Sequence, residues 1–199
     1  MWEERYAGED YLFGTAPADF LPRVAGWLVP EQTALCIADG EGRNSVWLAG
    51  QGLSVAAFDP SGNAVAKARR LAGEKGVEVA FHVTDLDGWD WSVAHDVVAG
   101  IFIQFVGPVE RAELFRRIDR ALKPGGLLLI HGYAPRQVGY GTGGPPDPEN
   151  MYTLDLLRGA FAGYEVLRAE DFDADVDEGK GHSGRSALID FVARKPGAA

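Results

Sequence analysis

Glycine and acidic residues follow the first three apolar runs of the chain in a regular order. The segment Ala38–Asn44 (ADGEGRN) follows the first run, Asp59 the second and Asp85 the third. Gly40 and Gly42 permit a tight turn and the close backbone approach that a bound nucleoside needs. Asp59 comes 19 positions after Gly40, close to the roughly 20 expected for a carboxylate that accepts ribose hydroxyls. The pattern predicts a nucleoside cofactor.

The spacing of the glycines distinguishes between cofactors. A dinucleotide site needs a third glycine in G-x-G-x-x-G, and Ser45 stands at that position. Because the third glycine lets a helix approach the strand beneath a pyrophosphate, its absence favours a cofactor without phosphate. The acidic Glu41 in the turn favours the same choice. S-adenosylmethionine (SAM) contains adenosine and no phosphate, and Asp85 can accept a hydrogen bond from its adenine amino group.

Short apolar runs alternate with stretches of helical period, and these elements must place the residues above. We expect strands at 33–38, 53–58, 77–83, 96–102 and 127–131, and helices at 43–51, 64–72 (with Ser61 as the N-cap) and 109–122. The cluster Lys123–Gly126 (KPGG) breaks the last helix. Apolar strands that alternate with helices indicate a parallel α/β sheet with helices on both faces.

The last third of the chain has a different pattern. We expect a Gly/Pro-rich loop at 139–150, a helix at 154–161, and strands at 164–169 and 187–193. Glu170–Gly181 shows no strong period and predicts no regular element. The two strands predict a hairpin that closes one edge of the sheet.

Ligands of open parallel α/β sheets bind beyond the carboxyl ends of the strands. The fourth strand is followed by Phe102, Gln104 and Phe105, and the fifth by Gly132 and Tyr133. Glycines, acids and aromatic residues are therefore expected at one edge of the sheet.

Composition narrows the class of partner. The chain has 199 residues and a formal net charge of −10, which repels nucleic acids and anionic membranes and favours a small-molecule substrate. The acidic N-terminus is unlike a signal peptide, and the single Cys36 excludes an internal disulfide, so we expect a cytoplasmic protein. No apolar run is long enough for a membrane span. We expect a monomer or homodimer. His82, His95 and His131 lack ligand spacing, so we expect no metal site.

These motifs together resemble the class I SAM-dependent methyltransferases, and most closely the branch of tellurite-resistance and thiopurine-type methyltransferases. The resemblance is carried by Gly40–Asn44, Phe58–Ser61, Asp85-Leu86, Leu122–Gly126, and the opening Trp2–Tyr6 with Phe13-Gly14 and Pro17. It implies a Rossmann-like, seven-stranded, mostly parallel sheet whose last strand is antiparallel. We expect one domain over 1–199, with a lid at 1–16, a SAM-binding core at 33–134 and a substrate-side region at 135–195.

The resemblance also implies roles for individual residues. The expected cofactor-binding residues are Arg5, Tyr11, Ala38, Asp39, Gly40, Asn44, Asp59, Pro60, Asp85, Leu86, Ile101 and Phe102. Arg5 is expected to meet the SAM carboxylate, and Phe102 to lie beside the reacting end. Tyr6, Gln104 and Tyr133 are expected to bind the substrate.

Methyl transfer is an in-line displacement, so the protein acts mainly by positioning. His182 and Arg185, which resemble a His and Arg implicated at the substrate site of the tellurite-type branch, are the expected catalytic residues. His182 could act as a base and Arg185 could hold an anion. No strong base stands at a strand end, which favours a thiol or a chalcogen oxyanion as acceptor.

Two alternatives remain open. The family usually has an acid at position 36 and a glycine at 38, where this chain has Cys36 and Ala38. A SAM-binding protein without catalysis is therefore one alternative. An NAD-dependent oxidoreductase is another, against which the missing third glycine argues.

Overall fold

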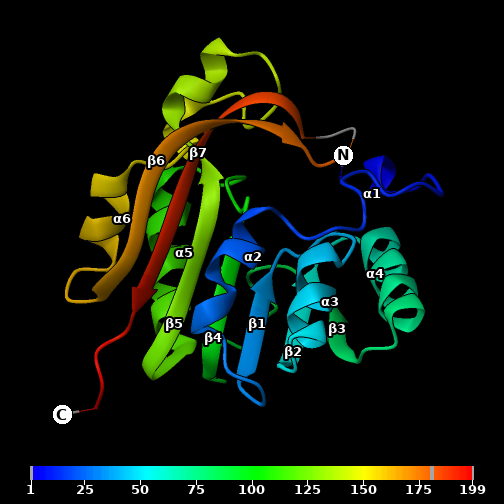
Figure 1. Cartoon of the computed structure of the whole chain (residues 1–199), viewed down its shortest axis with the longest axis horizontal. Coiled ribbons are helices and arrows are strands. Elements are labelled where there is room, and N and C mark those ends of the chain that lie inside the picture. The colour runs from blue at the N-terminus through cyan, green and yellow to red at the C-terminus, as the bar shows by residue number, and fades with distance from the viewer. Residues whose placement is uncertain (1, 180–181, 199) are drawn as a thin grey trace. The chain divides into compact units, whose positions relative to one another are not determined.

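The structure, a computed structural model, describes residues 2–179 and 182–198, and its strands follow the order β3-β2-β1-β4-β5-β7-β6 (Figure 1). The strands are β1 (Thr33–Ile37), β2 (Ser54–Asp59), β3 (Val79–Val83), β4 (His95–Ile101), β5 (Leu122–Tyr133), β6 (Glu165–Asp177) and β7 (Ser183–Arg194). The β1–β2, β2–β3 and β4–β5 pairs are parallel, and β7 is antiparallel to β5 and β6. This confirms the predicted seven-stranded fold with an antiparallel last strand.

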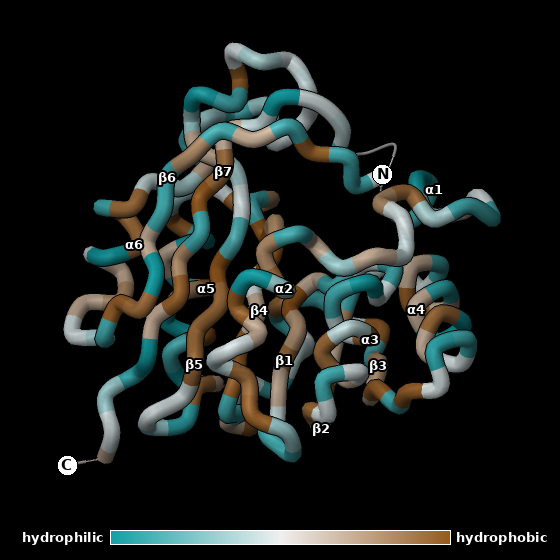
Figure 2. Tube along the Cα trace, in the orientation of Figure 1, coloured by the Kyte–Doolittle hydropathy of each residue, from teal (hydrophilic) through white to brown (hydrophobic). Residues whose placement is uncertain are grey.

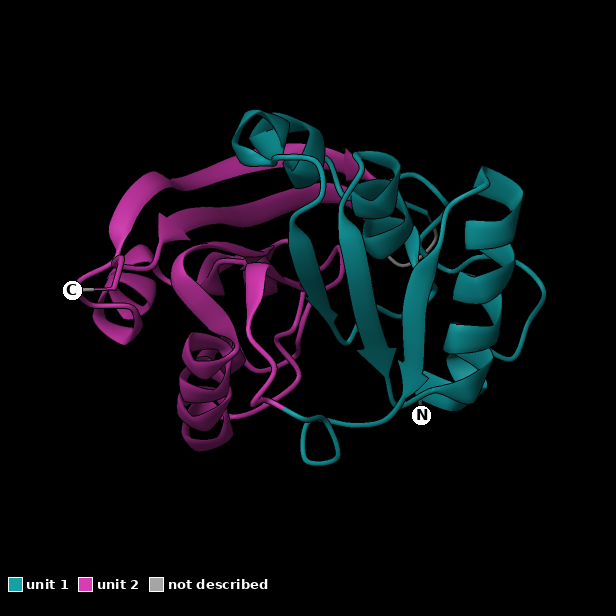
Figure 3. Cartoon of the chain, turned by 90° about the horizontal axis from the view of Figure 1, so that it is seen from below, with its two compact units in different colours: residues 1–90, 178–181 teal, residues 91–177, 182–199 magenta. Residues whose placement is uncertain are grey.

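The chain packs as two compact units (Figure 3). Their described parts are residues 2–90 with 178–179, here called unit 1, and residues 91–177 with 182–198, here called unit 2. Unit 1 contains the predicted glycine turn, and unit 2 contains the aromatic residues that follow the fourth and fifth strands.

Unit 1 combines three parallel strands with helices. Its helices are α1 (Trp2–Arg5), α2 (Phe20–Val24), the 3₁₀ turn η1 (Ala25–Trp27), α3 (Arg43–Gly50) and α4 (Gly62–Lys75). Ser61 caps α4 as predicted, because its hydroxyl accepts a hydrogen bond from Ala64 N at 3.1 Å. Helices α3 and α4 pack on β1–β3, so both helices start next to the ends of strands.

Both the backbone conformation and the packing require a glycine at position 42. Its φ is +86°, a value that few residues other than glycine adopt. A Cβ at this position would also lie only 2.6 Å from Ala68 Cβ in α4. Gly42 therefore lets the start of α3 approach α4 closely, which is the close approach that the sequence predicted for this turn.

Unit 2 contains β4–β7. Its helices are α5 (Pro108–Arg120), η2 (Pro135–Gly139), η3 (Pro148–Asn150) and α6 (Leu154–Ala160). Helix α5 packs on β5, and α6 packs on β6 and β7. The core strands β4, β5 and β7 are buried over most of their length, which agrees with their apolar sequences.

The prediction that Glu170–Gly181 lacks regular structure is wrong for residues 170–177, which belong to β6; Gly181 lies outside the described residues. The period is two rather than helical. Phe172, Ala174 and Val176 belong to an apolar cluster with Tyr133, Met151 and Leu188, whereas the residues between them are aspartates. Figure 2 shows the alternation along β6, and the acidic residues on one face concealed it in the sequence.

The start of β5 also differs from the prediction. The expected strand 127–131 is confirmed, but β5 begins at Leu122, which pairs with His95. The pairing shifts and resumes at Leu127 with Val97. Gly125 in this irregular stretch has φ +76°. The predicted breaker therefore forms a bulge within a strand.

Within the described residues, no helix is long and apolar enough to cross a membrane.

Candidate functional site

The turn after β1 has an unusual backbone. Ala38, Gly40 and Gly42 all have positive φ values, of 47°, 61° and 86°. Left-handed conformations are costly for residues with a side chain, so the surroundings must hold Ala38 in place. The turn presents backbone with few side-chain atoms beyond the end of β1, as a close-fitting ligand requires.

Asp59 braces this turn from the end of β2. One carboxylate oxygen accepts a hydrogen bond from Gly40 N, and the other accepts one from Ser61 N, each at 2.9 Å. A carboxylate has about four acceptor directions, so each oxygen retains one for a hydroxyl. Burial raises the pKa of the Asp59 carboxyl, and the two backbone hydrogen bonds oppose that rise.

Asp39 lies in the same turn and binds the start of α3. Its carboxylate accepts hydrogen bonds from the Ser45 hydroxyl and from Ser45 N. Burial raises the pKa of Asp39 to about 7, while the Ser45 hydrogen bonds lower it. Cys36 is buried in β1, and burial raises the pKa of its thiol well above its ordinary value. Asp39 therefore supplies a carboxyl group next to the start of α3, and Cys36 is a neutral thiol.

The charges around the turn fit a nucleoside without phosphate. Two buried cations near the turn are already paired: Arg43 with Glu178 at 2.7 Å, and Lys67 with Glu41 at 2.8 Å. A phosphate at the turn would therefore compete with carboxylates for these two cations. Asp39 and Asp59, in contrast, suit ammonium and hydroxyl groups. The residues present fit SAM.

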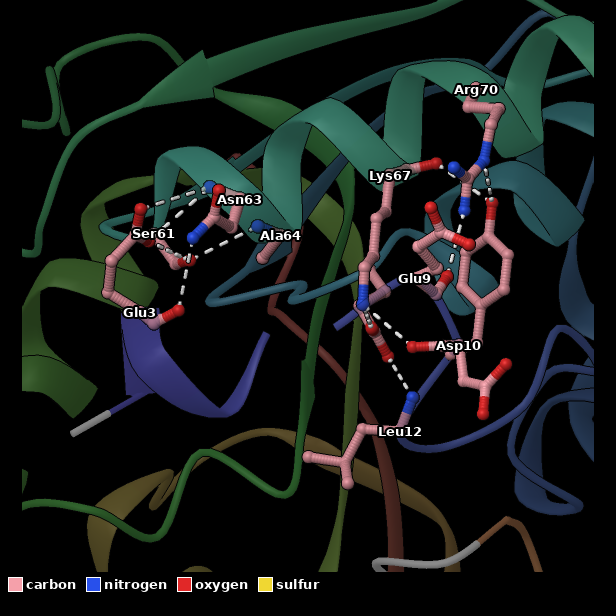
Figure 4. Close-up of polar contacts among 11 residues, drawn as sticks. Glu3, Glu9, Asp10, Leu12, Ser61, Asn63, Ala64, Lys67 and Arg70 are labelled. Carbon is pink, nitrogen blue, oxygen red and sulfur yellow. Dashed lines mark hydrogen bonds and ion pairs between the residues drawn. The ribbon is translucent and has the colours of Figure 1, made fainter. Parts of the chain in front are cut away.

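Two groups of contacts made by acidic side chains attach the N-terminal segment Trp2–Leu12 to α4, in addition to the hydrogen bonds from Arg70 to Tyr11 and to Glu9 O, and Figure 4 shows them. In the first, the Lys67 ammonium donates to Asp10 O at 2.7 Å and to Glu41. The second Glu41 oxygen accepts from Leu12 N at 2.8 Å. Because Lys67 and Glu41 are both buried, this attachment, here called the inner clasp, is shielded from solvent.

The second attachment, here called the outer clasp, lies at the N-terminus of α4. The Ser61 hydroxyl donates to the Glu3 carboxylate, which also accepts from Asn63 N at 3.3 Å. The Asn63 amide donates to Glu3 O at 3.2 Å. A carboxylate at a helix N-terminus is favoured by the helix dipole. Because the contacts to Asn63 are exposed, this clasp is the weaker of the two.

Tyr6 lies between the two clasps and covers the glycine turn. Its hydroxyl is 3.0 Å from the place where a Cβ on Gly40 would be, and its ring stacks on Trp2 with centroids 5.6 Å apart. The Arg5 guanidinium lies 4.2 Å from the centroid of the Trp2 ring. Tyr6, a predicted substrate residue, thus lies against the predicted cofactor turn.

Two other predicted cofactor residues of this segment and of α3 bind the protein itself. The Tyr11 hydroxyl donates to Lys67 O at 3.2 Å. The Asn44 side-chain oxygen accepts from Ala18 N at 2.9 Å. Both tie the N-terminal region to the helices of unit 1.

The residues after β2 and β3 are more open. Pro60 and Asp85 are exposed, and Leu86 is half-buried. Asp85 holds its own turn, because its carboxylate accepts from Asp87 N at 3.1 Å and from Gly88 N at 2.9 Å.

In unit 2, an aromatic cluster stands at the ends of β4 and β5. The Phe102 ring lies 4.3 Å from His182, 5.0 Å from Tyr133 and 4.8 Å from His131, measured between centroids. Phe102 has φ +57°, an uncommon value for a bulky residue. Ile101, which precedes it, is buried. The predicted residues His182, Tyr133 and Phe102 are thus brought together.

Gln104 and Arg185 have other partners. Gln104 is buried, donates to Tyr133 O at 2.8 Å and accepts from Tyr133 N at 2.7 Å. Arg185 is exposed and lies 3.9 Å from Asp173 and 3.8 Å from Asp175 on β6. Gln104 therefore supports the backbone of Tyr133, and the Arg185 charge is shared with acids of the neighbouring strand.

Several polar residues of these regions were not predicted. Glu3 and Lys67 make the clasps, and their pairing over long sequence separations left no local signal. His131 and Asp190 form a buried pair in unit 2. Here a signal existed, because Asp190 interrupts the apolar run 187–193. Among the described residues, no three His, Cys, Asp or Glu side chains are grouped so as to hold a metal ion.

Comparison with known families adds to this geometry. Residues 34–126, which include the glycine turn, Asp59 and Asp85, match a family described as "Methyltransferase domain". The segment 34–126 is therefore similar to class I methyltransferase domains. SAM is the cofactor of this family.

One curated protein that is similar to part of this chain is a carboxy-S-adenosyl-L-methionine synthase from Desulfotalea psychrophila. It is 34% identical over 82 residues, which are 40% of this chain and 34% of the relative. The chain therefore matches about a third of the length of that relative.

Solved structures share the fold of the domain. One, from work on the conversion of a disulfide bond into a thioacetal group during echinomycin biosynthesis, has a TM-score of 0.75 and 22% identity, over 96% of this chain and 87% of the other. TehB from Haemophilus influenzae has a TM-score of 0.74 and 18% identity, over 92% of this chain and 63% of the other. Magnesium protoporphyrin IX methyltransferase from Synechocystis PCC 6803, with bound S-adenosylhomocysteine (SAH), has a TM-score of 0.68 and 17% identity, over 98% of this chain and 92% of the other.

The raised pKa of Asp39 makes stability depend on pH. A pKa near 7 in the folded state, above the unfolded value of about 3.9, means that the protonated acid is favoured on folding. This stabilisation is complete at low pH and is lost as pH rises from about 4 to about 7. We predict that Asp39→Asn, which stays neutral, gains melting temperature relative to the parent as pH rises across this range.

The control is Asp155→Asn, at a side chain that is 99% exposed. Its melting temperature should follow the parent at every pH. A constant offset between Asp39→Asn and the parent from pH 4 to 8 would contradict the expected titration.

The two clasps predict graded mobility of the N-terminal segment. SAH should slow amide exchange over Trp2–Phe13 if the segment orders over the cofactor. In Glu3→Ala without ligand, the amides of Tyr6 and Ala7 should exchange faster, because the outer clasp is lost, while Leu12, held by Glu41, should not change.

Glu9→Ala in the same segment is the control, because Glu9 accepts a hydrogen bond from Arg70 through its backbone oxygen. Exchange that is equal with and without SAH would exclude a lid. Equal acceleration of Tyr6 and Leu12 would mean that the segment opens as one piece.

Proposed function

We propose that this protein is a methyltransferase that moves a methyl group from SAM to a small-molecule acceptor, and that the acceptor is a thiol or a chalcogen oxyanion. The observation that carries the proposal is the methyltransferase-domain match over 34–126, which covers the braced glycine turn. The proposal assigns the cofactor mainly to 33–134, and the acceptor mainly to 135–195.

SAM supplies an electrophilic methyl group on a sulfonium. In the proposal, the Ala38–Gly42 backbone and Asp39 bind the amino-acid part, and Asp59 accepts the ribose hydroxyls through its remaining acceptor directions. Asp85 and Leu86 bind the adenine, and Tyr6 covers the turn. An ammonium group beside Asp39 would favour the ionised carboxylate, so binding and deprotonation of Asp39 should be coupled.

The acceptor side of the proposal uses the aromatic cluster of unit 2. Phe102 and Tyr133 exclude water around the reacting atoms, and their faces favour a nearby cation. His182, in contact with both rings, takes the proton of a thiol. A thiol needs little further help, because with a pKa of about 8.5 a few per cent is thiolate at neutral pH.

Two comparisons support sulfur or its heavier relatives as the acceptor. The echinomycin structure concerns the conversion of a disulfide into a thioacetal, and TehB, a tellurite-resistance protein, shares the fold. Arg185 supports an anionic acceptor less directly, because Asp173 and Asp175 lie near its guanidinium.

Cys36 favours a second candidate, a SAM-binding protein without catalysis. The thiol is buried and its raised pKa keeps it neutral, so it cannot replace a carboxylate. Turnover distinguishes the two functions, because the second candidate binds SAM without consuming it.

The test is methyl transfer to a panel of thiols and selenium and tellurium oxyanions, next to oxygen and nitrogen acceptors. We expect turnover with the first group. His182→Ala should lower kcat for a thiol about tenfold or more, as loss of proton transfer usually does. Arg185→Ala should mainly raise KM for an anionic acceptor.

Arg158→Ala on α6 is the matched control, because its side chain is 51% exposed, close to the 53% of Arg185. Full activity of both site variants with intact SAM binding would exclude His182 and Arg185 from the acceptor site. Turnover confined to oxygen or nitrogen acceptors would refute the acceptor class, and no turnover with SAM bound would favour the second candidate.

A further inference from the structure

A buried polar trio in the sheet of unit 2 has no part in the function proposed above. His131 on β5 lies opposite Asp190 on β7, and His131 Nδ1 is 2.8 Å from Asp190 Oδ1. The other Asp190 oxygen accepts from Arg168 Nε on β6 at 3.1 Å. Asp190 is 0% exposed and His131 is 2% exposed. The interior of the sheet thus holds a carboxylate next to an imidazole.

Stability alone does not explain this trio. A buried carboxylate pays a large desolvation cost, and apolar residues of similar size are often equally or more stable in its place. The residues on the same face of the strands, Leu188 and Val192 next to Asp190 and Leu129 next to His131, are buried and apolar. Leucines in place of the pair would therefore lie among apolar side chains.

The hydrogen bond to Asp190 fixes the imidazole. An ionised carboxylate only accepts hydrogen bonds, so we assign the proton of His131 to Nδ1. The carboxylate is in turn held by Arg168, whose other nitrogen donates to Glu170 at 2.6 Å. The ring of His131 therefore has a defined plane as well as a defined position.

His131 supports Phe102 in two ways. Phe102 N donates to His131 O at 2.8 Å, and the two rings meet edge to face at an interplanar angle of 77°. Phe102 has a left-handed backbone with φ +57°. A bulky residue keeps such a conformation only when its surroundings hold it.

Phe102 connects His131 to the residues of the acceptor side. Its ring contacts His182 and Tyr133, the residues that the proposed function places around the acceptor. We infer that His131, oriented by Asp190, is a positioning residue for methyl transfer, which holds Phe102 in the conformation that aligns the acceptor with the methyl group. This inference rests on the proposed function.

The test replaces the pair together. In His131→Leu/Asp190→Leu no buried polar group of the pair is left unpaired, a change that can be neutral for stability, and Arg168 keeps Glu170. We expect a melting temperature no lower than that of the parent. SAH affinity and acceptor KM should stay within about twofold, while kcat falls about tenfold or more, because loss of alignment acts on the reacting geometry.

Two further variants serve as controls. Asp190→Asn keeps an oxygen that accepts from His131 Nδ1, so it should retain kcat within about threefold of the parent. His95→Leu is the matched control, a buried histidine on β4 whose ring nitrogens have no hydrogen-bond partner in the part of the chain that the structure describes. Its kcat should equal that of the parent.

A double variant with parental kcat would overturn the inference and leave the proposed function intact. A parallel loss of melting temperature, SAH affinity and kcat would also overturn it, because the trio would then be merely structural. Should the double variant not fold, Asp190→Leu decides, because it removes the hydrogen bond that orients His131: the inference stands if kcat falls about tenfold while SAH affinity and the kcat of Asp190→Asn are kept, and it falls if kcat is parental. A parent that transfers methyl to no acceptor refutes the proposed function, and this inference with it.

Discussion

The organisation of unit 1 depends on the carboxylate of Asp59. By accepting from Gly40 N and Ser61 N at once, it joins the turn after β1 to the start of α4. The turn has three left-handed residues and would be costly without such a brace. The position of α4 in turn determines where Lys67 and Asn63 meet the N-terminal segment. Asp59 thus holds both the glycine turn and the start of α4, the helix to which the N-terminal segment is attached.

Acidic side chains organise the rest of unit 1 in the same way. Glu41 accepts from Leu12 N, and Glu178 accepts from Asp19 N, each while paired with a cation. Because these pairs use the nearby cations, the turn keeps an acidic character that suits a cofactor with ammonium and hydroxyl groups. Unit 2 follows a related rule, since the buried Asp190 orders His131 and, through it, Phe102.

The fold could be predicted from the sequence where local patterns are strong. The strands, the Ser61 cap and the hairpin followed from apolar period and capping chemistry. The length of β6 did not, because Asp171, Asp173 and Asp175 alternate with weakly apolar residues and resemble a loop. The β5 bulge was missed because Lys123–Gly126 reads as a breaker, and only pairing with β4 shows that the strand begins before it.

The candidate site, too, could be predicted only in part from the sequence. The motif residues Gly40, Asp39 and Asp59 lie together in unit 1, because β1 and β2 are parallel neighbours whose carboxyl ends lie at the same edge of the sheet. Glu3, with its partners about 60 residues away, could not be found from local spacing. Gln104 was assigned to the substrate from its place after a strand, yet its side chain is committed to the backbone of Tyr133.

The central claim is that the braced turn of this chain accepts a nucleoside without phosphate. Isothermal calorimetry of the full chain with SAM, SAH and NAD tests it most directly. The account predicts saturable heat with SAM and SAH and none with NAD. Saturable binding of NAD, with no heat from either SAM or SAH, would contradict it.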